Sequence, residues 1–165
     1  MTQQSVARVG IVVGSRSDMA AAQRASAVLD ELEVESEIRV ISAHRAPGLL
    51  AAYVGSAGER GIRLFIAIAG LAAHLPGVIA SQTIAPVIGV PMPGGVSDGL
   101  DALLAVVQMP KGVPVATVGV GNGENAALLA AGILAVADPS LAARLAERRR
   151  AAANAIAEDP ANEGL

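Results

Sequence analysis

The chain has 165 residues and a formal net charge of −3, and it is long enough for one domain with a substantial core. Because it has no cysteine, disulfides, thiol nucleophiles and zinc–thiolate sites are excluded. Its two histidines are too few for a multi-histidine metal site, and its weakly acidic charge and single tyrosine and phenylalanine argue against nucleic acid as a partner. Hydrophobic residues make up 53% of the sequence, but no uninterrupted apolar run approaches the roughly 18 residues of a membrane span.

The chain begins with polar residues, which are followed by a β-branched run. Residues 1–5 lack the charged start and the apolar core of a secretory signal, so we expect a cytoplasmic protein. Residues 8–13 predict a buried strand, and Gly14–Asp18 follow it as a loop. A helix is expected from there to about Leu32, because apolar residues recur at the i, i+3, i+4, i+7 spacing of one helix face.

The middle of the chain repeats this alternation of strand and helix. Residues 37–41 alternate in polarity and predict a second strand, and a helix over 47–60 is expected to end at Gly61. Residues 64–69 are apolar throughout, which is typical of a parallel strand covered on both faces. A short helix is expected near 78–82.

The last part of the chain contains two more strands and three more helices. We expect an aspartate at 98 or 101 to cap the first of these helices and the tail 158–165 to fray. In chain order, the sequence predicts a strand over 86–90, a Pro- and Gly-rich loop over 91–95, a helix that includes 100–107, a strand over 114–120, a turn over 121–125, a helix to about Ala137 and, after a break at Asp138-Pro139, a helix over 140–157.

Five strands that alternate with helices predict an α/β fold: one domain of three layers around a doubly wound, parallel, five-stranded sheet. We expect one catalytic domain over 1–165, with an α/β core over 6–137 and an extra C-terminal helix over 140–157. The flavodoxin-like order 2-1-3-4-5 is the most common for such a sheet. That order brings the loops after the first three strands together at one edge.

Each of these three loops carries residues suited to chemistry, and each also has a plainer interpretation. Gly14–Asp18 opens a helix with free amides that suit phosphate, or it is an ordinary helix cap. Ser42–Pro47 holds a titratable imidazole and a guanidinium, or it is a solvated surface loop. Gly70–Gly77 has small residues that let a ligand approach the backbone, or it only packs tightly. His74 is either a structural or a catalytic histidine.

A glycine pattern near the C-terminus imitates a dinucleotide-binding motif. Gly119, Gly121 and Gly123 have the spacing of its first glycines, but they follow the fifth strand rather than the first. We interpret them as a tight turn. Together the three loops suit a phosphorylated, nucleotide-like small molecule that undergoes proton transfer, and the residues alone do not name it.

At these same loops the chain resembles the N5-carboxyaminoimidazole ribonucleotide mutases of de novo purine (IMP) biosynthesis, the class I PurE family. The matching segments are Gly14–Asp18, Ser42–Pro47, Ala69–Gly77, Val107–Thr117 and Asn125–Ala130. The resemblance implies a cofactor-free isomerase. In such enzymes the carbamate leaves the exocyclic nitrogen as carbon dioxide, which is held and then added to the neighbouring ring carbon.

The resemblance also implies a role for each site residue. His44 would be the general acid and base, a role that the unperturbed pKa of histidine near 6.5 suits, and Ser42 would act beside it. Phosphate, ribose and the carbon dioxide pocket would be held by the remaining residues. Ser15, Ser17 and Arg45 are implied for the phosphate, Asp18 for the ribose, Ser42 and the backbone of Gly70–Ala73 for carbon dioxide with His74 beside them, and Gly14, Ala43, Ala72, Ala73 and Leu75 for further substrate contacts.

Two alternatives remain. A related branch carboxylates aminoimidazole ribonucleotide directly; it typically has Lys in place of Arg45 and lacks the run Ala73–Gly77. The other alternative is a phosphate-binding regulatory domain without activity. Leu71 stands where the family commonly has glycine, and residues 92–95 differ from its more polar run. The apolar surplus predicts a homo-oligomer, and the resemblance implies an octamer.

Overall fold

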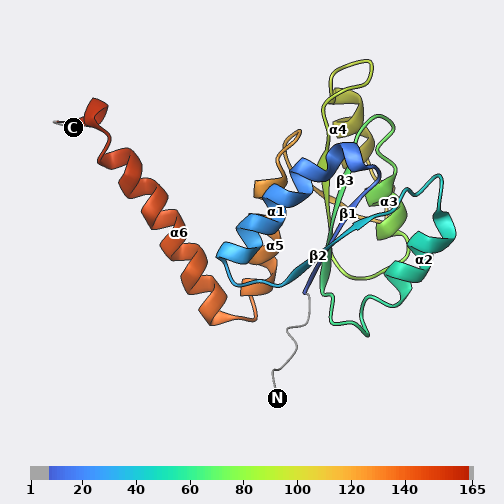
Figure 1. The fold of residues 1–165 in the computed structure, drawn as a ribbon, viewed down its shortest axis with the longest axis horizontal. Helices are drawn as coiled ribbons and strands as arrows, with labels where there is room; N and C mark the ends of the chain where they lie inside the picture. Colours follow the sequence, from blue (N-terminus) through green and yellow to red (C-terminus); the bar gives the residue numbers. More distant parts are fainter. Residues whose placement is uncertain (1–7, 164–165) are drawn as a thin grey trace.

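The computed structural model describes residues 8–163 as one α/β domain (Figure 1). The segment 1–5, expected to lack a secretory signal, and the last two residues of the tail lie outside this range. The five strands pair in parallel in the order β2-β1-β3-β4-β5, as the sequence predicted. Their bounds are β1 Val9–Val13, β2 Ser36–Val40, β3 Leu64–Ala69, β4 Val87–Pro91 and β5 Ala116–Thr117.

Helices cover both faces of the sheet. In Figure 1, α1 and α5 lie on one face and α2, α3 and α4 on the other, while α6 projects away from the body. No described helix is long and apolar enough to cross a membrane. The bounds are α1 Met19–Glu31, α2 Pro47–Gly55, α3 Leu75–Ala80, α4 Leu100–Val107, α5 Gly123–Ala135 and α6 Pro139–Ala157, with short 3-10 helices at η1 Arg16–Asp18 and η2 Pro160–Asn162.

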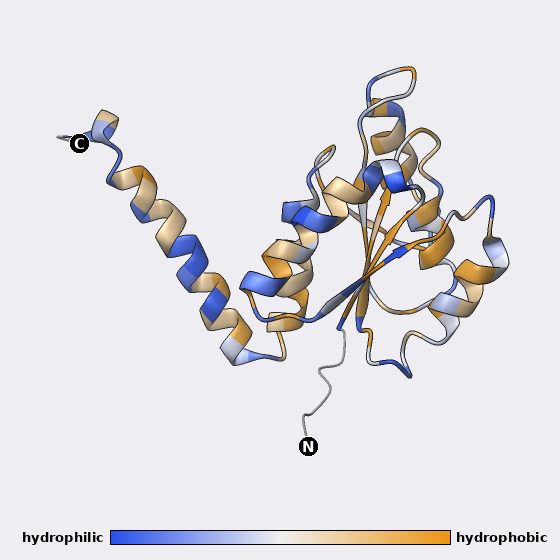
Figure 2. Cartoon of the chain, viewed as in Figure 1, coloured by the Kyte–Doolittle hydropathy of each residue, from blue (hydrophilic) through white to orange (hydrophobic). Residues whose placement is uncertain are grey.

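The core follows from the apolar strands, which Figure 2 shows running through the centre of the domain. Every residue of β1, β3 and β4 is buried, because parallel strands are covered by helices on both faces. Successive side chains alternate between the two faces: Ile11 packs with α1 and α5, whereas Val12 packs with α2, α3 and α4.

Small residues bring α1 and α5 very close together, along a contact that we call the alanine seam. Gly123 begins α5 at a point where an added Cβ would collide with the backbone carbonyl of Ala21. The sequence uses alanine here because larger side chains would push the helices apart. The seam consists of Ala21, Ala22 and Ala25 of α1, all buried, and Gly123, Ala126, Ala127, Ala130 and Ala131 of α5, also buried.

Several predicted bounds differ from the structure. α2 ends at Gly55, not at Arg60, and the Ser56 hydroxyl donates to the carbonyls of Ala52 and Tyr53, a side-chain competition that favours helix ends. β5 has only two paired residues, Ala116 and Thr117, within the strand predicted over 114–120, and Pro114 near its start has no amide to donate to a ladder. α3 begins at Leu75, earlier than predicted, with Pro76 in its first turn.

The predicted cap of α4 is wrong. Gly99, which has no side chain, occupies the N-cap with a positive φ of 96°. Asp98 Oδ1 instead accepts from the Gly94 amide at 3.2 Å, and Asp101 Oδ2 accepts from the Val96 amide at 3.1 Å. Both carboxylates therefore hold the preceding loop, and Asp101 Oδ1 also accepts from the first-turn amide of Ala102 at 3.1 Å.

The C-terminal helix is joined to the body at its base. Asp138 Oδ1 accepts from the hydroxyl of Ser140 at 2.7 Å and from the amide of Leu141 at 3.1 Å, and its other oxygen accepts from Arg8 Nη1 at 3.1 Å. These hydrogen bonds lower the pKa of Asp138 to about 2, and the bond from Ser140 contributes most to this shift. The break at Asp138-Pro139 is as predicted. Within the tail, Asp159 caps η2 through a 2.8 Å bond to Ala161.

Candidate active site

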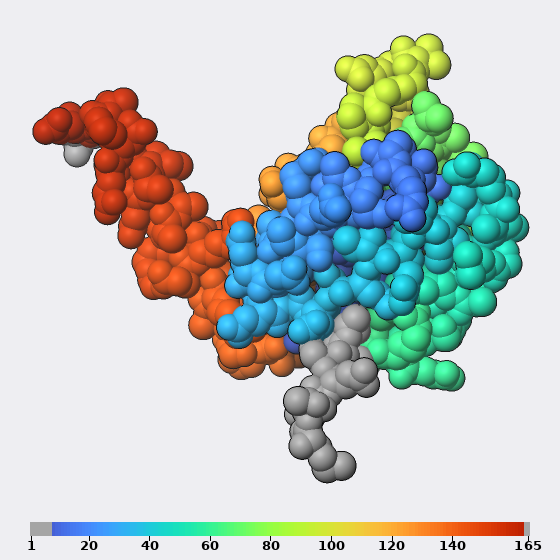
Figure 3. All heavy atoms as spheres, in the orientation of Figure 1, coloured from blue at the N-terminus to red at the C-terminus, as the bar shows by residue number. Residues whose placement is uncertain are grey.

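A cavity of about 790 Å³ opens at the carboxyl ends of β1, β2, β3 and β4. In the sheet order, β1 lies between β2 and β3, so this is the switch point at which open α/β sheets bind ligands. In Figure 3 the chain segments that follow β1, β2 and β3 gather at one edge of the molecule. The cavity is lined by Gly14, Ser15, Ser17, Asp18, Ser42, Ala43, His44, Arg45, Ala69, Gly70, Leu71, Ala72, Ala73, His74, Leu75, Met92 and Pro93.

The structure brings every sequence-predicted site residue to this one cavity. Three lining residues were not predicted, Ala69, Met92 and Pro93, and Leu71 was expected only through its backbone in the segment Gly70–Ala73. Met92 and Pro93 follow β4, and the rule that ligands lie at strand carboxyl ends would have found them. The turn at Gly119–Gly123 does not line the cavity: the Gly121 amide donates to Pro91 O at 2.8 Å, and Gly123 belongs to the alanine seam.

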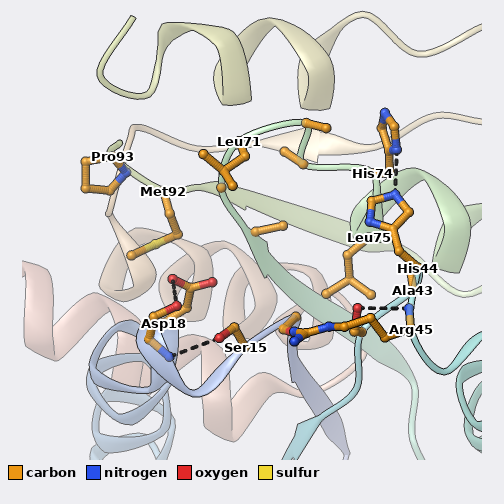
Figure 4. Close-up of a pocket in the computed structure, with 17 residues that line it drawn as sticks. Ser15, Asp18, Ala43, His44, Arg45, Leu71, His74, Leu75, Met92 and Pro93 are labelled. Carbon is orange, nitrogen blue, oxygen red and sulfur yellow. Dashed lines mark hydrogen bonds between the residues drawn. The ribbon is translucent and has the colours of Figure 1, made fainter. Parts of the chain in front are cut away.

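The loop after β1 presents two hydroxyls and a carboxylate (Figure 4). Ser15 caps η1 by accepting from the Ser17 amide at 3.4 Å, and the Ser17 hydroxyl donates to Asp18 Oδ1 at 3.2 Å. Asp18 occupies the N-cap of α1 but makes no capping bond there, so the interpretation of this residue as an ordinary cap fails. Burial raises the pKa of Asp18, and the bond from Ser17 offsets part of that rise.

The loop after β2 is tied to the loop after β1. The Arg45 amide donates to the Ser42 hydroxyl at 3.2 Å, and the Ala46 amide donates to the Ser42 carbonyl at 2.9 Å, which shapes a tight turn. The Arg45 guanidinium reaches across to the carbonyl of Gly14 at 3.2 Å. One bond accounts for a single donor of five, so Arg45 keeps further N–H groups for an anion in the cavity.

The two histidines of the chain meet in the cavity. His44 Nε2 and His74 Nδ1 are 2.8 Å apart, and the rings stand edge to face with their centroids 4.9 Å apart. At this distance one ring donates the proton and the other accepts it. Both side chains are exposed, so His74 is not a buried core histidine. The arrangement is able to pass a proton along two rings that belong to different loops.

The loop after β3 is a tight turn with unusual backbone conformations. The Ala73 amide donates to Gly70 O at 2.9 Å, and both Leu71 (φ 56°) and Ala73 (φ 43°) have positive φ. The base of this turn is held against the segment after β4, because Met92 N donates to Ala69 O at 2.9 Å and an added Cβ on Gly70 would lie 3.3 Å from Met92 Cβ.

The cavity consequently has two walls of different character. The loops after β1 and β2 supply its hydroxyls, its carboxylate and its guanidinium, and we call them the polar wall. The loops after β3 and β4 supply mainly alanine, glycine, leucine, methionine and proline, and we call them the apolar wall; the histidine pair stands where the walls meet. Within residues 8–163 no group of three or more His, Asp or Glu side chains is placed to hold a metal ion.

Known proteins match this chain over most of its length. The N5-carboxyaminoimidazole ribonucleotide mutase of Mycobacterium tuberculosis H37Rv is 53% identical over 138 residues, which are 84% of this chain and 79% of that protein. The mutase of Pyrococcus abyssi is 50% identical and covers 90% of this chain and 86% of its own length. The phosphoribosylaminoimidazole carboxylase of Schizosaccharomyces pombe is 50% identical, but the match spans only 25% of that protein.

Solved structures agree with the sequence matches. The crystal structure of Treponema denticola PurE has a TM-score of 0.87 and 29% identity, and the match covers 95% of this chain and 98% of that one. A family model described as AIR carboxylase matches residues 8–155. That range contains every residue that lines the cavity. The chain therefore belongs to the AIR carboxylase family.

Proposed function

We propose that this protein is an isomerase that interconverts N5-carboxyaminoimidazole ribonucleotide and 4-carboxy-5-aminoimidazole ribonucleotide in purine (IMP) biosynthesis. The observation that carries the proposal is that the matched range 8–155 holds the whole cavity, with the histidine pair between a polar and an apolar wall. Relatives that are about half identical over most of their length bear the mutase name.

The polar wall suits the ribose phosphate. Arg45 offers free guanidinium donors, and the hydroxyls of Ser15 and Ser17 lie on the same wall; a charge-assisted contact from arginine to phosphate is strong and directional. Asp18, which caps no helix amide, is available to accept from the ribose hydroxyls. Gly14 and Ala43 leave room for backbone contacts on this wall.

The chemistry needs one proton given and one proton taken. The bond between the carboxylate carbon and the exocyclic nitrogen breaks, carbon dioxide leaves, and the nitrogen keeps the electron pair and takes a proton. The ring carbon then attacks carbon dioxide, forms a carbon–carbon bond and loses its own proton. His44, bonded to His74 and turned into the cavity, supplies the first proton and removes the second.

Carbon dioxide is small and uncharged, so it suits the apolar wall. Gly70, Ala72, Ala73 and Leu75 line this part of the cavity, and the Ser42 hydroxyl lines the same cavity on the polar wall. An apolar surface offers water no hydrogen bonds and therefore favours retention of a small apolar molecule.

Direct carboxylation of aminoimidazole ribonucleotide is the second candidate reaction, because the Schizosaccharomyces pombe relative is named a carboxylase. We favour the mutase, since Arg45 and the run Ala73–Gly77 are the features that the resemblance associates with it. Turnover of the carbamate nucleotide should exceed turnover of aminoimidazole ribonucleotide with bicarbonate. Faster turnover of the second pair would overturn the choice.

A regulatory domain without activity is tested with His44→Asn. We expect turnover to fall by ~100-fold or more, the usual cost of a lost general acid–base. Turnover that stays within a few-fold of the parent would contradict the proposed role of His44.

We also propose a cytoplasmic homo-octamer. Its charged substrate stays in the compartment where it is made, because phosphate and carboxylate groups do not enter a bilayer. α4 exposes Leu100, Leu104 and Val107, and such a row of apolar side chains on one helix supports burial by another subunit. Light scattering should give a mass near eight times that of one chain, and a stable monomer would contradict the assembly.

A further inference from the structure

Leu71 is an unusual residue at its place in the cavity. It is the second residue of the turn closed by the Ala73-to-Gly70 bond, and its φ is 56°. Turns with positive φ at this position are dominated by glycine, asparagine and aspartate, because a Cβ is strained there. A leucine at such a position carries a cost that glycine would not.

The side chain of Leu71 gains little packing in return. It is 65% exposed although it is large and apolar. The backbone beneath it is fixed, since the strand end at Ala69 bonds to Met92. Leu71 is therefore a mostly unpacked side chain on a firmly held turn, and strained residues of this kind cluster at ligand contacts.

The position of Leu71 shows what it is able to contact. In Figure 4 it lies between Met92 and Pro93 on one side and the histidine pair on the other, across the cavity from Ser15 and Arg45. Its side chain adds a larger apolar surface to the apolar wall than the neighbouring Gly70, Ala72 and Ala73 do. A ligand whose phosphate lies on the polar wall would place its reacting end on the side of Leu71.

We propose that Leu71 covers the carbon dioxide released during the reaction and keeps it in the cavity until the ring carbon attacks it. This inference rests on the proposed mutase function. Leu71 takes no part in bond making or proton transfer. It determines how each released carbon dioxide is divided between the ring carbon, which yields the carboxylated product, and solution, which leaves aminoimidazole ribonucleotide.

The test measures retention of the transferred group. Substrate with a ¹³C-labelled carboxylate is turned over in unlabelled bicarbonate. Label loss is the sum of aminoimidazole ribonucleotide and of carboxylated product without label, measured by mass spectrometry after subtraction of the enzyme-free reaction. Leu71→Ala and Leu71→Gly should raise label loss roughly four- to fifteenfold, the factor that one or two CH₂ groups lost from an apolar contact are worth. KM should stay within about twofold, because uniform binding is unaffected.

Three controls separate side-chain contact from other effects. Leu71→Met, which keeps the apolar volume, should retain label like the parent. Leu71→Ala keeps the strained φ without the freedom of glycine, so label loss confined to Leu71→Gly would assign the effect to backbone freedom and overturn the proposal. Ile84→Ala removes another exposed apolar side chain, outside the cavity, and should leave label loss unchanged.

Stability and assembly complete the test. Leu71→Gly should melt at the same temperature as the parent or higher by up to roughly 4 °C, since it relieves a positive φ. If Leu71→Ala changes the mass measured by light scattering, Leu71 is a subunit contact and the proposal fails. If the parent interconverts the two nucleotides but no variant loses more label, only the role of Leu71 fails. A parent that does not interconvert them refutes the proposed function itself.

Discussion

The bond between His44 and His74 allows a quantitative test of how the two rings share their work. In His74→Ala the partner of His44 Nε2 is removed, while both side chains are exposed in the parent. Water therefore replaces the lost partner, and no buried group is left unsatisfied. A neutral hydrogen bond of this kind is worth about 0.5–1.5 kcal/mol, so kcat should fall by roughly two- to tenfold.

A double-mutant cycle shows whether His74 acts through His44. His44→Asn alone should cost ~100-fold or more in kcat. If His74 only orients His44 or exchanges its proton, His44→Asn/His74→Ala should be no slower than His44→Asn within about twofold, and the coupling free energy should equal the full effect of His74→Ala.

The assay is kcat at saturating carbamate nucleotide, with the melting temperature of each variant as a control for folding. KM should change little in His74→Ala, because the phosphate contacts that we propose lie on the polar wall. Losses that multiply in the double variant would refute the reasoning, since they would make His74 an independent catalytic group.

Three other predictions concern the phosphate, the alanine seam and the base of α6. Arg45→Met should raise KM by roughly 10–100-fold, as expected for a lost charge-assisted contact, and should leave weak binding of the unphosphorylated nucleoside unchanged. Gly123→Ala should destabilise the fold by about 1–3 kcal/mol in chemical denaturation, because its Cβ meets backbone, whereas Gly132→Ala in the same helix meets nothing and should stabilise slightly. The pKa of Asp138 is lowered from an ordinary 3.8 to about 2, so its ionised form stabilises the fold fully above pH 3.8. The parent should therefore melt at a higher temperature than Asp138→Ala at neutral pH, and this difference should shrink as pH falls from 3.8 towards 2.

The strand order was predictable because five strands that alternate with helices form a doubly wound parallel sheet, for which this order is the most common. β3 has the predicted bounds, Leu64–Ala69. All six of its residues are apolar, as expected for a parallel strand that helices cover on both faces. The predicted ends of helices and strands were wrong where tertiary contacts compete with the local hydrophobic pattern of the sequence. The segment after Gly55 is the clearest case: Arg60 leaves the predicted helix to pair with Glu37 and to stack over the ring of Tyr53, contacts that no periodicity reveals.

The pKa of Glu37 also depends on contacts that the sequence pattern does not reveal. Burial raises the pKa of Glu37, but the hydrogen bond from Arg60 and the charges of Arg39 and Arg60 outweigh burial, and the pKa ends below its ordinary value. These partners come from the strand and from the segment after α2, so their convergence depends on the fold.

The gathering of the candidate residues around one cavity was predictable, because they belong to three short motifs that the strand order brings together. The histidine pair was not predictable, because the separation of 30 residues between His44 and His74 says nothing about a 2.8 Å contact. Met92 and Pro93 were not predicted, because the Pro- and Gly-rich loop after β4 contains no titratable side chain that would indicate a chemical role. The strain at Leu71 likewise appears only once its φ is known.

The alanine seam has a consequence for the mutational tolerance of the protein rather than for its chemistry. α1 begins directly after Asp18, so the helix that the seam holds in place also positions the preceding loop, with the Ser15, Ser17 and Asp18 side chains that we propose for the phosphate and the ribose. A methyl group added between Ala21 and Gly123 would move that end of the cavity without touching a ligand. A survey of random inactivating mutations should therefore find a second cluster of sensitive positions along α1 and α5, where no chemistry takes place.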